Sequence, residues 1–357
     1  MKKTTKKLVA VLVAMVMMVT TLSVGAFAVW STKQSGSQTV RQADTMVLLG
    51  DSIPSGYGMH GDIGNAYTLV NQFTFGHGGF VEGTYPQIVA DELGVKNRYN
   101  YSRDAFRSVE IRRFLDPEYE AWLEQIENSQ EHFISDAIMY IANVGLGERA
   151  AMAAEMQESI RQADIIVLNF GNNDGGTYGF LAPFLKTMYY TFGLGVETAI
   201  AAMRGQLQMI TTLDQFVAVM GGYADFMTEM EIGKQRFFQN YDAIIQKLVE
   251  MNPNAEIYFM GMYDCFKDLN PQDNELRIWA SQQAYAYDSA VNNYVAHQSP
   301  WAGRVHYVAC PDVTMWQTAD FLTPMYFVNF LISVHPDAAG HQYMARQLLR
   351  AINGLVG

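Results

Sequence analysis

The chain has 357 residues, which is more than one average domain but within the range of a single α/β domain with insertions. Its 49% of hydrophobic residues and 17% of charged residues provide enough apolar side chains for a full core, so intrinsic disorder is excluded as the main state. With 24 Lys and Arg against 36 Asp and Glu, the net charge is −12. This acidic balance excludes a nucleic-acid partner held by phosphate neutralisation.

The first 28 residues have the pattern of a secretory signal peptide. Four lysines between Lys2 and Lys7 precede an apolar run from Leu8 to Val19, and the small-residue pattern Ala26-Phe27-Ala28 follows. We expect cleavage after Ala28 and release of an extracellular protein, whose net charge is −16 because four lysines and no acid are lost. The alternative is an uncleaved N-terminal membrane anchor. The apolar run is shorter than the roughly 20 residues of a membrane span, which favours cleavage over anchoring. We expect no membrane span in the mature chain.

Apolar runs and helical periodicity alternate after a polar leader over residues 29–43. We predict strands at Thr45–Leu49, Arg98–Tyr101, Ile165–Phe170, Ile257–Tyr263 and Val305–Ala309. We predict helices at Tyr85–Leu93, Ile111–Ile126, Gly147–Ile160, Gln235–Met251, Leu276–His297 and Gly340–Ile352. This alternation indicates an α/β fold with an open, mostly parallel sheet, helices on both of its faces, and ligands bound beyond the carboxyl ends of the strands.

We expect one domain over residues 44–357, with insertions near 57–84, 116–162 and 175–234. The first and third insertions follow predicted strands directly, so both are expected to shape a pocket. The third is apolar and aromatic around Phe180–Leu185 and Met188–Phe192. It is interpreted either as a lid or acyl-chain groove, or as helices that pack as additional core.

The chain has two cysteines, Cys265 and Cys310, and each follows a predicted strand. If those strands are parallel neighbours, the two thiols lie at the same edge of the sheet. Neighbouring strands are about 4.8 Å apart, which is within the range that a disulfide spans. Two alternatives therefore remain, a disulfide or two buried free thiols. The spacing of the cysteines does not suggest a zinc site.

Three polar residues stand where an α/β sheet presents catalytic groups. Ser52, in Gly50-Asp51-Ser52, follows the first strand, although a turn or capping serine has the same pattern. His335 precedes Pro336 and is therefore expected in an extended loop, which suits a general base as well as a surface histidine. Asn173 is either a donor to a developing oxyanion or an ordinary turn residue.

Four segments in order resemble blocks I, II, III and V of the SGNH hydrolases, also called the GDSL lipase/esterase family. They are Gly50–Ile53, Asn100–Ser108, Gly171–Asp174 and Val334–Pro336, and the similarity spans residues 45–353. The resemblance implies a flavodoxin-like, three-layer α/β/α fold. It also implies two-step acyl transfer without a metal or organic cofactor.

Position by position, the resemblance implies that Ser52 is the nucleophile and His335 the base. The oxyanion hole would consist of the backbone N–H groups of Ser52 and Ala105 and the side-chain amide of Asn173. Ala105 stands where the family usually has glycine. A backbone donor survives this change provided that φ at Ala105 is negative, and a positive φ would add strain.

The sequence departs from the family pattern at Ile332, where an aspartate normally orients the histidine. An apolar side chain cannot orient an imidazole. Three interpretations follow: a Ser–His dyad held by a backbone carbonyl, a displaced acid such as Asp312 or Asp320, or a site that has lost its activity.

The resemblance predicts a secreted carboxylic ester hydrolase. A lipid or another small acyl ester fits an apolar groove in the third insertion, and an O-acetylated glycan fits a protein that acts at a cell surface. A non-catalytic binding domain for a cell-wall sugar or a partner protein is the alternative of a different class, because the family aspartate is replaced by Ile332.

Overall fold

The computed structural model describes residues 43–59, 79–125, 130–145, 147–209, 215, 223–265, 275–316 and 334–355. The predicted signal peptide, nearly all of the leader, Asp320 and Ile332 lie outside the described residues. Among the described helices, none has the length and apolar character of a membrane span.

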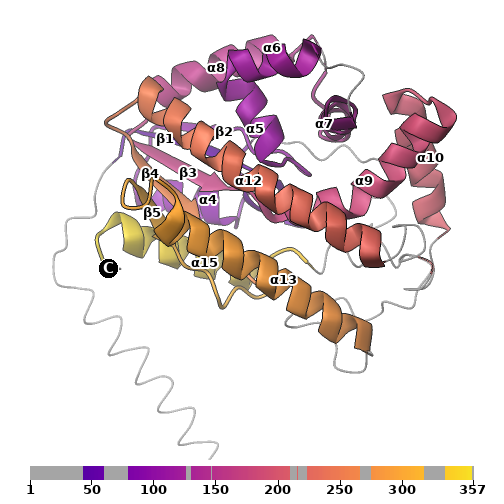
Figure 1. Ribbon diagram of the computed structural model, residues 1–357. Helices are drawn as coiled ribbons and strands as arrows, with labels where there is room; N and C mark the ends of the chain where they lie inside the picture. Colours follow the sequence, from indigo (N-terminus) through magenta and orange to yellow (C-terminus); the bar gives the residue numbers. More distant parts are fainter. Residues whose placement is uncertain are drawn as a thin grey trace, which may run out of the picture. The chain divides into compact units, whose positions relative to one another are not determined.

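Five strands form one sheet in the described part of the chain, and every neighbouring pair is parallel (Figure 1). They are β1 (Thr45–Gly50), β2 (Asn97–Asn100), β3 (Ile165–Asn169), β4 (Glu256–Met260) and β5 (Val305–Val308). Their order is β2-β1-β3-β4-β5, which confirms the predicted open parallel sheet. The chain changes its winding direction between β1 and β3, and the crevice beyond their carboxyl ends is where folds of this kind bind ligands.

The central strands consist of apolar residues because both faces of the sheet are covered. Every residue of β1 and β3 is buried, as expected for parallel strands between two helical layers. Successive side chains enter two different cores, since strand residues alternate between faces. Val47 and Ile166 belong to one core, and Met46 and Ile165 belong to the other.

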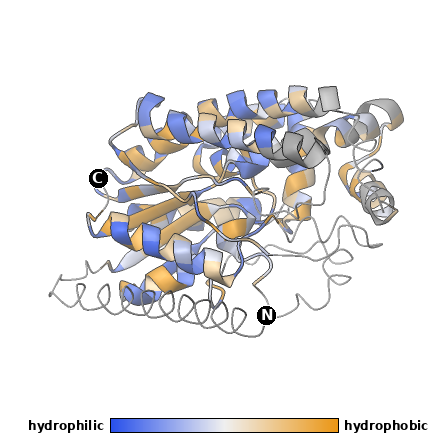
Figure 2. Ribbon diagram, turned by 90° about the horizontal axis from the view of Figure 1, so that it is seen from below, coloured by the Kyte–Doolittle hydropathy of each residue, from blue (hydrophilic) through white to orange (hydrophobic). Residues whose placement is uncertain are grey.

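Helices cover both faces of the sheet (Figure 1). Helices α4 (Tyr85–Glu92) and α15 (Ala338–Ile352) pack in the core that contains Met46. The opposite core contains residues of α5 (Ser108–Leu115), α7 (Gln130–Ile141), α8 (Arg149–Arg161), α9 (Asn172–Phe192), α10 (Val196–Gln208), α12 (Tyr223–Met251) and α13 (Glu275–Asn293). Figure 2 shows largely hydrophobic strands between helices of mixed hydropathy, the pattern of amphipathic helices.

Two predicted helices are each divided into two elements in the structure. The helix predicted at Ile111–Ile126 is divided into α5 and α6 (Pro117–Gln125). Asp116 between them has extended backbone angles, because a residue before proline is disfavoured in the helical conformation. The helix predicted at Leu276–His297 is α13 followed by a short π-helix, η2 (Tyr294–Gln298).

The insertion near 175–234 is mainly helical in its described part. Ala182, Leu185 and Met188 of α9 are buried in the core on the α12 side of the sheet. This burial agrees with the second interpretation of the insertion, helices packed as additional core.

The two cysteines follow β4 and β5, which are parallel neighbours as expected. Both thiols are nevertheless free. Burial raises the pKa of the Cys310 thiol to about 12 and also raises the pKa of the Cys265 thiol. The structure therefore has the second arrangement considered from the sequence, in which no disulfide forms.

Candidate active site

The turn after β1 places Ser52 at the first residue of a short helix, α2 (Ser52–Ser55). A side chain at Gly50 would lie 2.6 Å from the carbonyl oxygen of Asn169, so the close approach of β3 requires glycine there. Asp51 Oδ1 accepts the N–H of Ile53 at 3.0 Å and caps the turn. These contacts hold Ser52 at the carboxyl edge of the sheet with its side chain partly exposed.

His335 lies in the loop before α15, where the backbone bends. Its carbonyl oxygen accepts the N–H of Trp316 at 3.2 Å, and Pro336 forms an antiparallel bridge with Met315. On the other side, Asp337 caps α15 by accepting the N–H of Gly340 at 2.7 Å. The backbone of His335 is thus fixed from both directions.

The structure brings the predicted nucleophile and base together. His335 Nε2 lies 2.7 Å from Ser52 Oγ, although 283 residues separate them in sequence. Only 8% of the His335 residue surface is exposed, whereas Ser52 is partly exposed. A neutral imidazole at this distance is within reach of the serine proton.

Asn173 lies in the first turn of α9, directly after β3. Its side-chain amide donates to the carbonyl oxygen of Phe106 at 3.1 Å, so it touches the loop that carries Ala105. The two protein segments predicted to supply oxyanion donors are therefore in contact with each other.

Ala105 has a φ of +63°, which is the sign expected to add strain. This left-handed conformation is the one that glycine adopts without strain, and an alanine there costs of order 1 kcal/mol or more. The chain keeps the backbone geometry of a glycine although the glycine itself is absent.

Of the two acids considered for orienting His335, Asp312 lies in the described part of the chain. It is exposed, and its backbone hydrogen-bonds the side chain of Tyr343 on α15. Asp320 and Ile332 lie outside the described residues.

Buried carboxyl groups surround the site, and sequence reasoning did not single them out. Burial raises the pKa of Asp51 to about 7, although the Ile53 N–H and the Asn172 side chain lower it. Burial also raises the pKa of Asp104 well above its usual value, against a hydrogen bond from Ser55. Each of these two acids directly precedes a predicted site residue in the sequence. This adjacency is the only feature of the sequence that could have indicated them.

A third buried carboxyl group, Asp174, follows Asn173. Burial raises its pKa to about 7, against the hydrogen bonds from Ser108 and the charge of Arg107 that lower it. No cluster of three or more His, Cys, Asp or Glu side chains able to hold a metal ion occurs in the described ranges.

Comparison with known proteins identifies the class. The family model of the GDSL-like lipase/acylhydrolase family matches residues 48–343. The chain belongs to this family, and it is a carboxylic ester hydrolase of the SGNH/GDSL type. No curated protein matches the chain.

Three solved structures that match the chain share little sequence with it. A lipase from a goat rumen metagenome has 12% identity and a TM-score of 0.39, with 86% of this chain and 96% of that chain covered. An extracellular lipase from Streptomyces rimosus has 13% identity and a TM-score of 0.45, covering 88% and 100%. An acetyl xylan esterase from Butyrivibrio proteoclasticus has 15% identity and a TM-score of 0.39, covering 88% and 64%.

Proposed function

We propose that this protein is a serine esterase in which Ser52 is the nucleophile and His335 the general base. The observation that carries the proposal is the 2.7 Å distance between Ser52 Oγ and His335 Nε2. Family membership supports the same assignment, because the four sequence blocks of the family include both residues.

Acylation begins when Ser52 Oγ attacks the ester carbonyl carbon and His335 Nε2 takes the serine proton. The tetrahedral intermediate collapses as the C–O bond to the alcohol breaks, and the imidazolium gives its proton to the leaving alkoxide. Water then attacks the acyl-enzyme with His335 again as base, which releases the carboxylic acid and restores Ser52.

The oxyanion of each tetrahedral intermediate needs hydrogen-bond donors. We assign this function to the N–H groups of Ser52 and Ala105 and to the side chain of Asn173. The contact between Asn173 and the Phe106 carbonyl supports the assignment, since it holds the second loop beside the first. Donors of this kind are each worth about 10² to 10³ in rate.

The proposed catalytic unit consists of Ser52 and His335, which a described hydrogen bond joins. The hydrogen bond from Trp316 and the bridge at Pro336 fix the backbone of His335, which supports an oriented imidazole. This arrangement favours an active enzyme over a non-catalytic binding domain, even though Ile332 replaces the family aspartate.

Hydrolysis of esters with graded acyl length tests the proposal. p-Nitrophenyl esters of increasing acyl length and acetylated xylan are incubated with wild type, Ser52→Ala and His335→Ala. Ser159→Ala, a buried serine on α8, and His297→Ala, an exposed histidine, serve as matched controls. We expect activity to fall at least about 10³-fold only in the first two variants.

The same panel separates the substrate classes. Faster turnover of longer acyl chains identifies a lipid or other acyl ester, and preference for acetyl groups identifies an O-acetylated glycan. A fluorophosphonate probe should label wild type and not Ser52→Ala. An unlabelled wild type without esterase activity would instead support the binding-domain alternative.

We also propose that the protein is secreted. The basic segment, the apolar run and Ala26-Phe27-Ala28 support cleavage after Ala28. Mass spectrometry of the protein from the culture medium should find a mature chain that begins at Val29. A chain retained on membranes with its first residues intact would identify the anchored alternative.

A further inference from the structure

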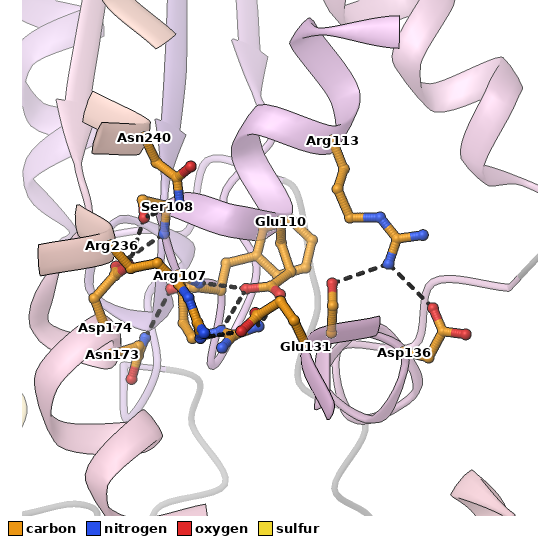
Figure 3. A network of polar contacts seen from close by, with 12 residues as sticks. Arg107, Ser108, Glu110, Arg113, Glu131, Asp136, Asn173, Asp174, Arg236 and Asn240 are labelled. Atoms are coloured by element: carbon orange, nitrogen blue, oxygen red, sulfur yellow. Dashed lines mark hydrogen bonds and ion pairs between the residues drawn. The ribbon is translucent and has the colours of Figure 1, made fainter. Parts of the chain in front are cut away.

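Two segments at the carboxyl edge of the sheet carry the proposed oxyanion donors: the loop that contains Ala105 and the first turn of α9, which contains Asn173. The contact between Asn173 and Phe106 is one link between these segments. A second link joins Asp174, the next residue of α9, to Ser108 at the start of α5. Asp174 of α9 accepts the backbone N–H of Ser108 at 2.8 Å through Oδ2 and the Ser108 hydroxyl through Oδ1 (Figure 3).

In the second link, each hydrogen bond has a defined donor and acceptor. Asn240 of α12 donates its side-chain N–H to Ser108 Oγ at 3.1 Å, so the serine hydroxyl accepts from Asn240 while it donates to Asp174. Arg112 donates to the side-chain oxygen of Asn240 at 3.2 Å and fixes that amide. Ser108 therefore presents two donors to Asp174, and a carboxylate is the group that accepts both.

The surroundings leave Asp174 little freedom to move. Only 1% of its surface is exposed. A side chain at Gly233 of α12 would overlap the carbonyl oxygen of Asp174, so the two helices touch through their backbones at this point. Ser108 is also the first residue of α5, where the helix dipole favours a nearby negative charge.

The Ala105 loop is supported from behind by a second buried group. Arg107 is fully buried, and its guanidinium pairs with Glu110 at 2.7 Å and with Glu131 at 3.0 Å. Arg236 of α12 also pairs with Glu131 (Figure 3). The loop thus has charged anchors on one side and the Asp174 link on the other.

We propose that Asp174 is a positioning residue that holds the Ala105 loop and Asn173 at the separation the oxyanion hole requires. This inference rests on the proposed function and extends it to a residue that touches neither substrate nor Ser52. Loss of the Asp174–Ser108 link should weaken binding of the tetrahedral oxyanion while leaving binding of the uncharged ester nearly unchanged.

The test compares wild type with Asp174→Asn, Ser108→Ala and Ser108→Thr at pH 8. An amide at position 174 has only one acceptor oxygen, so it faces one of the two Ser108 donors with an N–H group. For Asp174→Asn we expect kcat for p-nitrophenyl esters to fall about 10- to 100-fold with KM changed less than about 3-fold. Ser108→Ala should lose less, and Ser108→Thr, which keeps the hydroxyl, should restore the wild-type rate.

Phenylboronic acid gives an independent measurement, because it adds to an activated serine as a tetrahedral anion. Its inhibition constant should rise in Asp174→Asn by about the factor by which kcat falls. Asp242→Asn is the matched control: it removes a partly buried carboxylate of α12 that accepts hydrogen bonds from Tyr294 and Ser299, and no described hydrogen bond joins it to Ser108 or Asp174. Its unfolding temperature should fall while its kcat and its inhibition constant stay at wild-type values.

Two results would overturn the proposal. One is a wild-type kcat and inhibition constant in Ser108→Ala. The other is a loss in Asp174→Asn that matches its loss of folded protein and also occurs in Asp242→Asn. Failure of the proposed function itself is a different result, in which wild type has no Ser52-dependent esterase activity at all.

Discussion

The ring of Tyr57 lies against the imidazole of His335, with ring centroids 4.4 Å apart and planes inclined by 35°. Tyr57 follows α2, so the chain segment that carries the proposed nucleophile also packs on the proposed base. Only 6% of the Tyr57 surface is exposed. An aromatic ring at this distance attracts a cation, which is what His335 becomes when it takes the serine proton.

The first prediction separates the Tyr57 ring from its hydroxyl. Tyr57→Phe keeps the ring and should retain kcat within about 3-fold. Tyr57→Leu removes the attraction, worth about 1 kcal/mol, and should lower kcat by roughly 5- to 10-fold.

Steady-state rates of p-nitrophenyl ester hydrolysis check this prediction. A Tyr57→Leu rate equal to that of Tyr57→Phe would show that the ring only fills space. Tyr99→Leu removes a partly buried tyrosine that stacks on Tyr101 and serves as the control for general loss of packing.

The second prediction concerns Asp51 and the pH dependence of stability. Burial raises the pKa of Asp51 to about 7 in the folded protein, whereas its ordinary pKa, which applies to the unfolded chain, is 3.8. Between these values the folded state holds a proton that the unfolded state releases, so stability from this group is present below about pH 4 and is lost as pH rises to 7. Asp51→Asn cannot ionise and keeps an acceptor for the Ile53 N–H.

Urea unfolding at pH 5 and pH 8 checks the sign. The stability of Asp51→Asn relative to wild type should increase from the lower to the higher pH. A constant difference across this window would mean that Asp51 titrates near its usual pKa in the folded state.

The third prediction has the opposite sign and concerns His341 in the first turn of α15. His341 is fully buried, and its Nδ1 lies 3.4 Å from the backbone N of Tyr85. Burial first, and the nearby His335 second, lower its pKa from 6.5 to about 3. The unfolded chain therefore binds a proton below pH 6.5 that the folded protein refuses until about pH 3.

Wild type should lose the stabilising contribution of His341 as pH falls from 6.5 toward 3. His341→Gln keeps a polar acceptor but cannot titrate. The deficit of His341→Gln relative to wild type, measured by urea unfolding, should therefore shrink between pH 7 and pH 4.5. A deficit that grows in acid would contradict the buried, neutral imidazole.

Much of the fold could be predicted because its signals are local. The apolar run that forms β3 has no plausible position except between two helical layers. The parallel arrangement then brings the ends of β1 and β3 to one edge, which makes the proximity of Ser52 and Asn173 a consequence of topology. The order of the family blocks adds His335 to the same edge.

Other features depend on contacts that no local pattern contains. The 3.6-residue periodicity passes through Asp116 without interruption, and only the conformational restriction before Pro117 divides the helix. Tyr57 is adjacent to the serine turn in sequence, but its packing on His335 depends on how the last loop folds back. The link from Ser108 to Asp174 likewise joins residues of α5 and α9 that are 66 positions apart in the sequence.

The φ of Ala105 is a feature whose sign the sequence left open, and it yields the last prediction. The family glycine suggests a left-handed residue, but an alanine there favours negative φ, and the surrounding contacts decide between them. The N–H of Tyr101 bonds to Leu48 and that of Arg103 to Gly50, so β1 fixes the start of the loop. Asn173 and Ser108 fix its end. With both ends held, Ala105 adopts a φ of +63°.

Ala105→Gly should relieve this strain, of order 1 kcal/mol, and raise the unfolding temperature by about 2 °C. It should leave kcat within about 2-fold, because the backbone N–H keeps its place. Ala105→Val adds a β-branched side chain at a positive φ and should lower both the unfolding temperature and kcat. Calorimetry and p-nitrophenyl ester hydrolysis measure the two effects. If Ala105→Gly lost activity as Ala105→Val does, the methyl group and its packing would hold the loop, and the backbone contacts at its two ends would not suffice.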